Sequence, residues 1–518
     1  MAHNRLFYNV YIILFIQKMA FTIAINSENM SNKSKHIEHP PLSQASLLLP
    51  SPLDTLERLS TMPHTIALSS EAHAFLAAHP DLVSVDLLLP DQHGVLRGKR
   101  VPAQELIKVY KNGIFLPGSV FALDINGNTV ESTGIGFDTG DCDQPCRPIA
   151  NSLAMVPWQN KPMAQCLLTM EQEPGTPYFA NPRHILDRTC DQFTALGYTP
   201  MVAVELEFYL TDTERLDSGQ LQPPISPLTG LREADTQVYA VDNLDDYSAL
   251  LDDIISAAQL QNIPASTAVA EYAPGQFEVN LQHVADPVLA CDQALLLKRI
   301  IKSVSRQHGF SATFMAKPYA EQAGSGMHIH MSLLDAQGQN VFASQQPQPN
   351  TLLTQALAGL QNTMGDTMAL LCPKVNSYRR FQPDFFVAMA PTWGIDNRTV
   401  ALRIPNGPAN ARRIEHRVAG ADANPYLAMT ALLAGTLHGL THDLPLSDQT
   451  TGNGSLQQAP SLPLNWVDAY AKFAQSDFAN DYFGADFIKV YSAVQTQEYM
   501  DFNSQVSRLE IDWYQRTL

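Results

Sequence analysis

The stretch Val204–Phe208, V-E-L-E-F, decides how this chain folds, because it has the pattern of a buried strand that carries two carboxylates. In a strand, residues i and i+2 point to the same face, so Glu205 and Glu207 project together while the apolar residues face the other way. Burying a carboxylate is costly unless a positive partner meets it. We therefore expect this strand to lie beside bound cations or basic side chains.

Three more clusters of ionisable residues lie far from this strand along the chain. They are Glu271 and Glu278 in E-Y-A-P-G-Q-F-E, His328 and His330 in G-S-G-M-H-I-H, and Glu415 in R-R-I-E-H-R. Taken singly, each cluster is also compatible with a salt-bridged surface segment. Ligand sets rich in carboxylates, with an imidazole and no thiolate, suit Mg²⁺ or Mn²⁺ rather than structural zinc. Taken together, the clusters predict a site for two divalent cations.

Arginines gather in the same part of the sequence as the last cluster. They are Arg379, Arg380, Arg398, Arg403, Arg412, Arg413 and Arg417. Guanidinium groups bind phosphates and carboxylates in a bidentate fashion, so this concentration indicates an anionic ligand. Neither a P-loop motif nor a G-x-G-x-x-G motif is present. Divalent cations together with arginines therefore point to ATP bound at a site of another kind.

Composition excludes several classes of partner. The chain has 518 residues, and 33 basic against 51 acidic residues give a formal net charge of -18. Such a surface repels nucleic acid and anionic membranes, and it favours the approach of a cationic substrate. No run of about 20 apolar residues is present, so no membrane span is expected. The six cysteines show no metal-binding spacing and are predicted to be reduced thiols in a cytoplasmic protein.

The chain divides into an extension and two predicted domains. Residues 1–63 are expected to be a disordered or artefactual extension, because residues 6–25 are only loosely like a signal segment and a Pro/Ser-rich stretch follows. Residues 64–177 are expected to form a small β-rich domain, and residues 178–518 a larger second domain. Strands in the larger domain mostly return antiparallel between helices, so the predicted fold class is α+β.

Local patterns predict the elements of both domains. A hairpin is expected around D-Q-H-G, strand and turn over 118–128, and a helix that begins at Asn181-Pro182. The further predicted strands are 202–210, 276–282, 312–316, 327–333 and 399–404, and the further predicted helices are 245–261, 286–309, 423–440 and 464–509.

Six motifs in order give this chain a resemblance to the glutamine synthetase family from about Val83 to its C-terminus. The stretches R-I-E-H-R-V-A-G-A-D-A-N-P-Y-L-A and E-Y-A-P-G-Q-F-E-V-N-L look most like the branch that uses polyamines. The resemblance implies a small β-grasp domain, followed by a catalytic domain with a curved antiparallel sheet and flanking helices. It also implies a ring oligomer, expected to be a dodecamer, with active sites between neighbouring subunits.

The resemblance carries the family's metal sites and nucleotide site onto this sequence. One divalent ion would be held by Glu207, Glu271 and Glu278, and the other by Glu205, His328 and Glu415. ATP would be bound by His330, Ser332, Arg398, Arg403 and Arg413. The implied cofactors are ATP with two or three Mg²⁺ or Mn²⁺ ions.

The resemblance also implies where the substrates bind. Arg380 and Arg417 would hold glutamate and the transferred phosphoryl group, and Gly324 would lie in the loop that contacts glutamate. Asp124 of a neighbouring subunit would face the pocket for the acceptor amine. Asp124, Arg380 and Arg398 are the residues expected to act in catalysis.

The chemistry implied by the resemblance has two steps. The γ-carboxylate of glutamate attacks the γ-phosphate of ATP, and an amine then displaces phosphate from γ-glutamyl phosphate to give an amide. Positioning and charge neutralisation dominate such a phosphoryl transfer, which fits a site made of carboxylates and arginines. Two alternatives stay open: a glutamine synthetase that uses ammonium, and a structural relative without catalytic activity.

Three departures from the family pattern bear on these alternatives. Phe386, in P-D-F-F-V-A, stands where glutamine synthetases carry a glutamate that helps to deprotonate ammonium. A ring cannot act as a base but packs against methylene groups, so the expected acceptor is an alkylamine or diamine. Ala323 replaces an asparagine that contacts glutamate. His442 stands where some relatives carry an adenylylated tyrosine, so regulation by that route is not expected.

Overall fold

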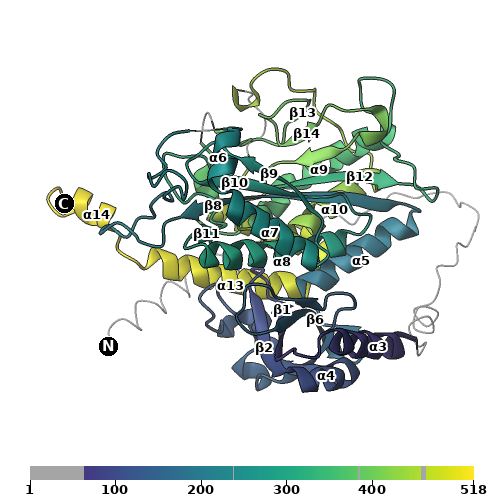
Figure 1. Cartoon of the computed structure of the whole chain (residues 1–518). Helices are drawn as coiled ribbons and strands as arrows, with labels where there is room; N and C mark the ends of the chain where they lie inside the picture. Colours follow the sequence, from purple (N-terminus) through teal and green to yellow (C-terminus); the bar gives the residue numbers. More distant parts are fainter. Residues whose placement is uncertain (1–62, 237, 383–384, 457–461) are drawn as a thin grey trace, which may run out of the picture. The chain divides into compact units, whose positions relative to one another are not determined.

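Two β-sheets, one after the other along the chain, organise the computed structural model of this protein (Figure 1). The structure describes residues 63–518 except residues 237, 383–384 and 457–461. The predicted extension, residues 1–63, lies outside the described residues but for Pro63, at which helix α3 (Pro63–Ala78) begins. The predicted α+β class is confirmed. Across the described part of the chain, no helix combines the length and apolar character that a bilayer span requires.

The first sheet forms an N-terminal β domain around the predicted hairpin. Strands β1 (Ser84–Pro90) and β2 (Leu96–Pro102) are antiparallel and are joined across D-Q-H-G, as expected. The strand order is β2-β1-β6-β4-β3, with β1 and β6 parallel. The other elements are η2 (Ala103–Glu105), α4 (Leu106–Asn112), β3 (Ile114–Pro117), η3 (Gly118–Ala122), η4 (Glu131–Thr133), η5 (Phe137–Thr139), β4 (Asp143–Pro148), β5 (Ala154–Met155), β6 (Met163–Glu173) and β7 (Thr176–Pro177).

The strand predicted within residues 118–128 is wrong. All five residues of η3 are buried, so the alternation of a half-buried strand is absent and a 3-10 turn forms instead. The following D-I-N-G-N segment is a turn, as predicted. Its Asp124 carboxylate accepts hydrogen bonds from the backbone N (2.8 Å) and the side-chain Nδ2 (3.0 Å) of Asn128, which favours a compact loop over an extended strand.

The second sheet is the framework of the catalytic domain. Its order is β13-β14-β15-β12-β8-β10-β9, with β11 beside β8, and every pair is antiparallel except β13 with β14. The long strand β8 therefore lies between the strands that carry the other ionisable clusters. Its strands are β8 (Thr199–Thr211), β9 (Ala265–Ala270), β10 (Gln276–Leu281), β11 (Ser311–Thr313), β12 (Met327–Leu334), β13 (Trp393–Ile395), β14 (Leu402–Ile404) and β15 (Ile414–His416). Strands β11 and β14 are shorter than predicted.

Helices cover this sheet, and α5 begins at the predicted cap. The Asn181 side chain accepts from the backbone N of Arg183 at the start of α5, where proline follows the cap. Helix α8 packs on β8 and on α7, and α9 packs along α10 (Figure 1). The helices are α5 (Pro182–Ala195), α6 (Val241–Asp246), α7 (Ser248–Leu260), α8 (Pro287–Gln307), α9 (Thr351–Leu371), η6 (Ser377–Arg380), η7 (Ala409–Ala411), α10 (Pro425–Thr441), η8 (Gly454–Leu456), α11 (Trp466–Ala474), α12 (Asp477–Phe483), α13 (Ala485–Asn503) and α14 (Arg508–Tyr514).

The contact between α9 and α10 depends on glycines. A Cβ added to Gly359 would lie 2.1 Å from the carbonyl oxygen of Gly435 and 2.4 Å from the backbone N of Gly439. Both atoms belong to the backbone of the other helix, so they cannot move aside locally. At Gly365, on the same helix, the nearest atom to an added Cβ is Nζ of Lys472, the flexible end of a side chain.

These two glycines give a matched test of the helix contact. We expect Gly359→Ala to lower the free energy of unfolding by about 1–3 kcal/mol, because the clash outweighs the gain of about 1 kcal/mol in helix propensity. Gly365→Ala should be neutral or slightly stabilising. Thermal and urea unfolding of both variants measure the difference. Equal stability of the two variants would contradict the close approach of α9 and α10.

Candidate active site

The strand register brings the ionisable clusters of the sequence together. On β8, Glu207 is paired with Glu278 of β10, and Glu205 is paired with His328 of β12. Residues that are far apart in the sequence thus share one sheet. The structure brings together the predicted ligands on strands β8, β10, β12 and β15.

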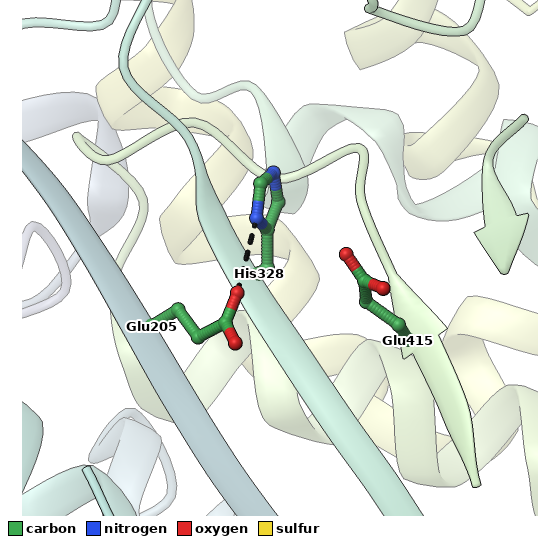
Figure 2. A group of neighbouring side chains, drawn as sticks. All are labelled: Glu205, His328 and Glu415. Atoms are coloured by element: carbon green, nitrogen blue, oxygen red, sulfur yellow. Dashed lines mark ion pairs between the residues drawn. The ribbon is translucent and has the colours of Figure 1, made fainter. Parts of the chain in front are cut away.

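The first group of metal-ligand candidates joins three strands. Glu205 of β8, His328 of β12 and Glu415 of β15 each present a ligand atom within 4.8 Å of the others (Figure 2). Nδ1 of His328 lies 3.4 Å from a carboxylate oxygen of Glu205. Two carboxylates and one imidazole form a donor set that suits Mg²⁺ or Mn²⁺, so these residues fit a divalent cation.

The second group shares the same imidazole. Glu207, Glu278 and His328 also present ligand atoms within 4.8 Å of one another, and Nε2 of His328 lies 3.7 Å from Glu207. The family resemblance assigned His328 to one ion, whereas here it lies between two carboxylate sets. Glu271, the sixth predicted ligand, belongs to neither group. It precedes β10, and its backbone N donates to the carbonyl oxygen of Gln276.

Burial and mutual repulsion hold two of these carboxyl groups in their protonated form. Burial, with the negative charges of Glu207 and Glu205, raises the pKa of Glu271 to about 8, although Arg398 opposes the shift. Burial and the neighbouring carboxylates raise the pKa of Glu278 to about 9. The pocket therefore carries more negative charge than its own side chains neutralise, which is a further fit to bound cations.

The carboxylates nearest the basic residues behave in the opposite way. Burial favours the neutral form of Glu205, but hydrogen bonds from His328 and His330 outweigh it and lower the pKa of Glu205. Burial is likewise outweighed at Glu415, where Arg417 and the two histidines lower the pKa to about 2. These two carboxylates are ionised and ready to bind a cation.

Arginines predicted to bind ATP are tied to the metal-ligand candidates through hydrogen bonds. Nε of Arg413 donates to Nδ1 of His330 at 3.0 Å, so His330 must donate from Nε2 to Glu205, 2.8 Å away. Nη1 of Arg403 donates to Glu415 at 2.8 Å, and Arg417 also donates to Glu415. Three predicted nucleotide residues, His330, Arg403 and Arg413, are thus hydrogen-bonded to metal-ligand candidates or to one another.

Three glycines pack against Arg380, which is predicted to bind glutamate. A Cβ added to Gly324 would lie 2.6 Å from Cγ of Arg380 and 2.8 Å from the carbonyl oxygen of Ala316. Nη1 of Arg380, a buried side chain, donates to the carbonyl oxygen of Val418 at 2.9 Å. Added Cβ atoms at Gly326 and Gly420 would also meet the Arg380 guanidinium, at 3.3 and 3.4 Å. The structure therefore brings Gly324 and Arg380 together.

The remaining predicted residues lie at different depths. Ser332 is buried on β12, and Arg398 precedes β14. The Phe386 ring is 59 % exposed, and its backbone has a φ of 52°, a strained value for an aromatic residue. Nζ of Lys317 lies 3.8 Å from the ring centroid of the adjacent Phe385.

Asp124 is buried in the N-terminal β domain, where its carboxylate accepts a hydrogen bond from the backbone N of Asn128.

Sequence reasoning did not find the groups that orient Glu207. The backbone N of Gly326 donates to Glu207 at 2.7 Å. Nε2 of Gln276 donates to the carbonyl oxygen of Gly324 at 3.1 Å and lies 3.5 Å from Glu207. The G-S-G and G-Q-F-E motifs contained these residues, but backbone donors give no signal of their own in a sequence.

The raised pKa of Glu278 gives a test in the metal-free protein. The folded state keeps this proton up to a pH of about 9, whereas the unfolded chain releases it near its ordinary pKa of 4.5. Stability should therefore fall as the pH rises from about 5 to about 9. Glu278→Gln removes the titration, so its melting temperature should fall less over this range.

Two controls accompany this measurement. Glu214→Gln, at an exposed glutamate, should follow the wild type, and Mn²⁺ should restore the wild-type melting temperature at high pH. A Glu278→Gln profile parallel to that of the wild type would contradict the buried, protonated carboxyl group.

Comparisons with known proteins place the whole catalytic domain in one family. A family model described as "Glutamine synthetase, catalytic domain" matches residues 179–514. Among curated proteins, γ-glutamylputrescine synthetase PuuA of Escherichia coli (strain K12) is 46% identical over 447 residues, which are 86% of this chain and 94% of that protein. Glutamate–isopropylamine ligase of a Pseudomonas species is 31% identical and covers 85% of this chain and 96% of its own length.

Solved structures give the same result at the level of the fold. The structure titled "Apo GmaS without ligand" superposes with a TM-score of 0.74 at 26% sequence identity, and it covers 86% of this chain and 99% of its own. A structure titled "GmaS/ADP complex-Conformation 1" matches with the same TM-score and the same identity over 85% of this chain. The chain belongs to the glutamine synthetase family.

Proposed function

We propose that this protein is an ATP-dependent ligase that joins the γ-carboxylate of glutamate to a primary amine, with putrescine as the favoured acceptor. The observation that carries the proposal is the joined network of carboxylates, His328 and arginines on one sheet. The 46% identity to γ-glutamylputrescine synthetase supports the choice of acceptor. The free state of all six cysteines supports a cytoplasmic location.

The first step transfers a phosphoryl group. An oxygen of the glutamate γ-carboxylate attacks the γ-phosphorus of ATP, the bond to the β–γ bridging oxygen breaks, and ADP leaves. Divalent cations held by the two carboxylate groups would neutralise charge on the phosphates. Arg398, Arg403 and Arg413 surround the polyphosphate, and Arg380 and Arg417 orient glutamate, so that attack occurs in line.

The second step forms the amide. The neutral amine nitrogen attacks the γ-carbonyl carbon of γ-glutamyl phosphate, loses a proton, and expels inorganic phosphate. Asp124 of a neighbouring subunit in a ring assembly is proposed to receive the amine, consistent with its carboxylate chemistry. In the single chain Asp124 is turned toward its own loop, so this role rests on the family resemblance.

The exposed ring of Phe386 favours an alkylamine over ammonium. A phenylalanine supplies no base for ammonium, and its face provides an apolar surface for a methylene chain. All of the predicted metal ligands and arginines are present in the sequence, which disfavours the alternative of a non-catalytic relative.

A panel of amines tests the acceptor directly. Putrescine, isopropylamine, ethanolamine and ammonium are compared by ADP release in the presence of glutamate. We expect putrescine to give the highest kcat/KM, at least about tenfold above ammonium, because a pocket shaped for an alkyl chain gains contacts that ammonium cannot make. Preferential use of ammonium would show that the protein is a glutamine synthetase proper.

Substitution of metal-ligand candidates tests the site itself. His328→Ala and Glu271→Ala should each lower kcat by about a thousandfold or more, because several kcal/mol of charge stabilisation are lost. ADP release measures activity, Mn²⁺ titration measures binding, and size-exclusion chromatography checks the assembly. Glu214→Ala, at an exposed site, serves as the matched control. Near-normal turnover of either active-site variant would refute the ligand assignment.

A further inference from the structure

A cavity lies between the N-terminal β domain and the helices of the catalytic domain. It has a volume of about 940 Å³, and its walls include Asp86 of β1, Trp158, Lys302 of α8 and Asp422. None of the residues proposed above to hold metal, nucleotide or glutamate lines it. The cavity is therefore distinct from the candidate active site, and its volume suits a small organic ligand.

Basic side chains dominate the polar lining of this cavity. Helix α8 contributes four cations to the wall: Lys298, Arg299, Lys302 and Arg306. Arg100 of β2 and Lys374 also line it, whereas its only lining carboxylates are Asp86 and Asp422. Such a concentration is unusual in a chain whose net charge is -18. Arg100 and Arg299 already pair with Asp86, Lys374 pairs with Glu498, and Lys298 donates to two backbone carbonyls. The exposed side chains of Lys302 and Arg306 are therefore the cations left to attract an anion to this cavity.

Both acidic residues of the wall accept hydrogen bonds, although the buried Oδ1 of Asp422 has no hydrogen-bond partner among the described residues. Asp86 accepts from Nε of Arg100 at 2.7 Å and from Nη2 of Arg299 at 2.8 Å. Asp422 accepts from the hydroxyl of Ser377 at 2.6 Å. Asp86 pairs with Arg100 and Arg299, and neither wall carboxylate forms an ion pair with Lys302 or Arg306 in the described part of the chain.

Lys302 and Arg306 have no counter-charge of their own. Within the described part of the chain, neither side chain makes an ion pair or a hydrogen bond, and Nζ of Lys302 lies 5.5 Å from the ring centroid of Phe314. The buried Nε of Arg299 also has no partner among the described residues. Burial and the nearby positive charge of Lys302 lower the pKa of Lys298 to about 7, as expected where cations lie close together.

We propose that this cavity binds a small organic anion with two or more carboxylate or phosphate groups. Lys302 and Arg306 bind the anionic groups, since both cations are free to pair. The rings of Trp158 and Phe314 and the side chain of Leu295 supply an apolar surface for the body of the ligand. Guanidinium and ammonium groups together recognise carboxylate and phosphate alike, so the two sources share one chemistry.

The cavity shares a wall with the loop that positions Arg380. Asp422 binds Ser377, which begins the short helix η6 that ends at Arg380. Asn376, also in the wall, accepts from the backbone N of Lys317 at 2.8 Å and donates to the carbonyl oxygen of Lys317 at 2.9 Å. If Arg380 holds glutamate, as the proposed function requires, the bound anion acts on glutamate binding more than on ATP binding.

Binding is tested by calorimetry on the full-length, metal-free protein, so that chelation plays no part. Citrate probes carboxylate recognition and pyrophosphate probes phosphate recognition. At least one anion should bind the wild type, and the double variant Lys302→Gln/Arg306→Gln should bind it at least about tenfold more weakly. The control Lys108→Gln/Arg508→Gln removes two exposed cations outside the cavity and should bind as the wild type does.

Two results would overturn the proposal. One is the absence of binding by either anion, and the other is binding that survives in the Lys302→Gln/Arg306→Gln variant, which would assign the anion to the active-site arginines. Because calorimetry needs no turnover, its outcome is independent of the proposed reaction.

The link to glutamate is measured separately, at a fixed concentration of free Mg²⁺. The anion that binds should change the KM for glutamate in the wild type but not in the double variant. An unchanged KM for glutamate with an altered KM for ATP would refute the shared wall as the route of coupling.

Discussion

Repulsion between carboxylates on neighbouring strands is the constraint on which this structure depends. Glu207 and Glu278 are paired across β8 and β10, a position where like charges destabilise a sheet. Two features reduce this repulsion: the raised pKa of Glu278 keeps that carboxyl group protonated, and His328 lies between the two carboxylate groups. Divalent cations bound at the proposed sites would remove the rest of the repulsion. The side chains of the sheet therefore leave part of the negative charge of these carboxylates without a partner, which is the arrangement expected of a cation-binding sheet.

Hydrogen bonds extend this electrostatic arrangement to the residues proposed to bind the nucleotide. Arg413 contacts His330, His330 contacts Glu205, and Arg403 contacts Glu415. Glu205 on β8 and Glu415 on β15 are thus each oriented by a residue with a proposed role toward phosphate. Such second contacts fix the tautomer of the imidazole and the direction of the carboxylate. Binding of cation and nucleotide is expected to be mutually dependent for this reason.

Much of this arrangement could be predicted from the sequence, because period-two spacing of charged residues in an apolar stretch has few explanations. The positions of β8, β10 and β12 and the cap at Asn181 followed from local patterns alone. The sharing of His328 did not, since it depends on the register between strands. Helix α9 was missed because its two glycines and its threonines weaken the helical signal. The 3-10 turn η3 looked like a strand because burial on all sides also gives an apolar run.

The glycines around Arg380 have a consequence for how this family can diversify. Gly324, Gly326 and Gly420 leave no room for a side chain beside the guanidinium, so backbone alone forms that wall. If Phe386 lies beside the acceptor amine, as proposed, evolution or a designer can reshape that end of the reaction through an exposed position at little structural cost. The acid-binding end offers no comparable freedom, and new acyl donors would require the main chain itself to be rebuilt.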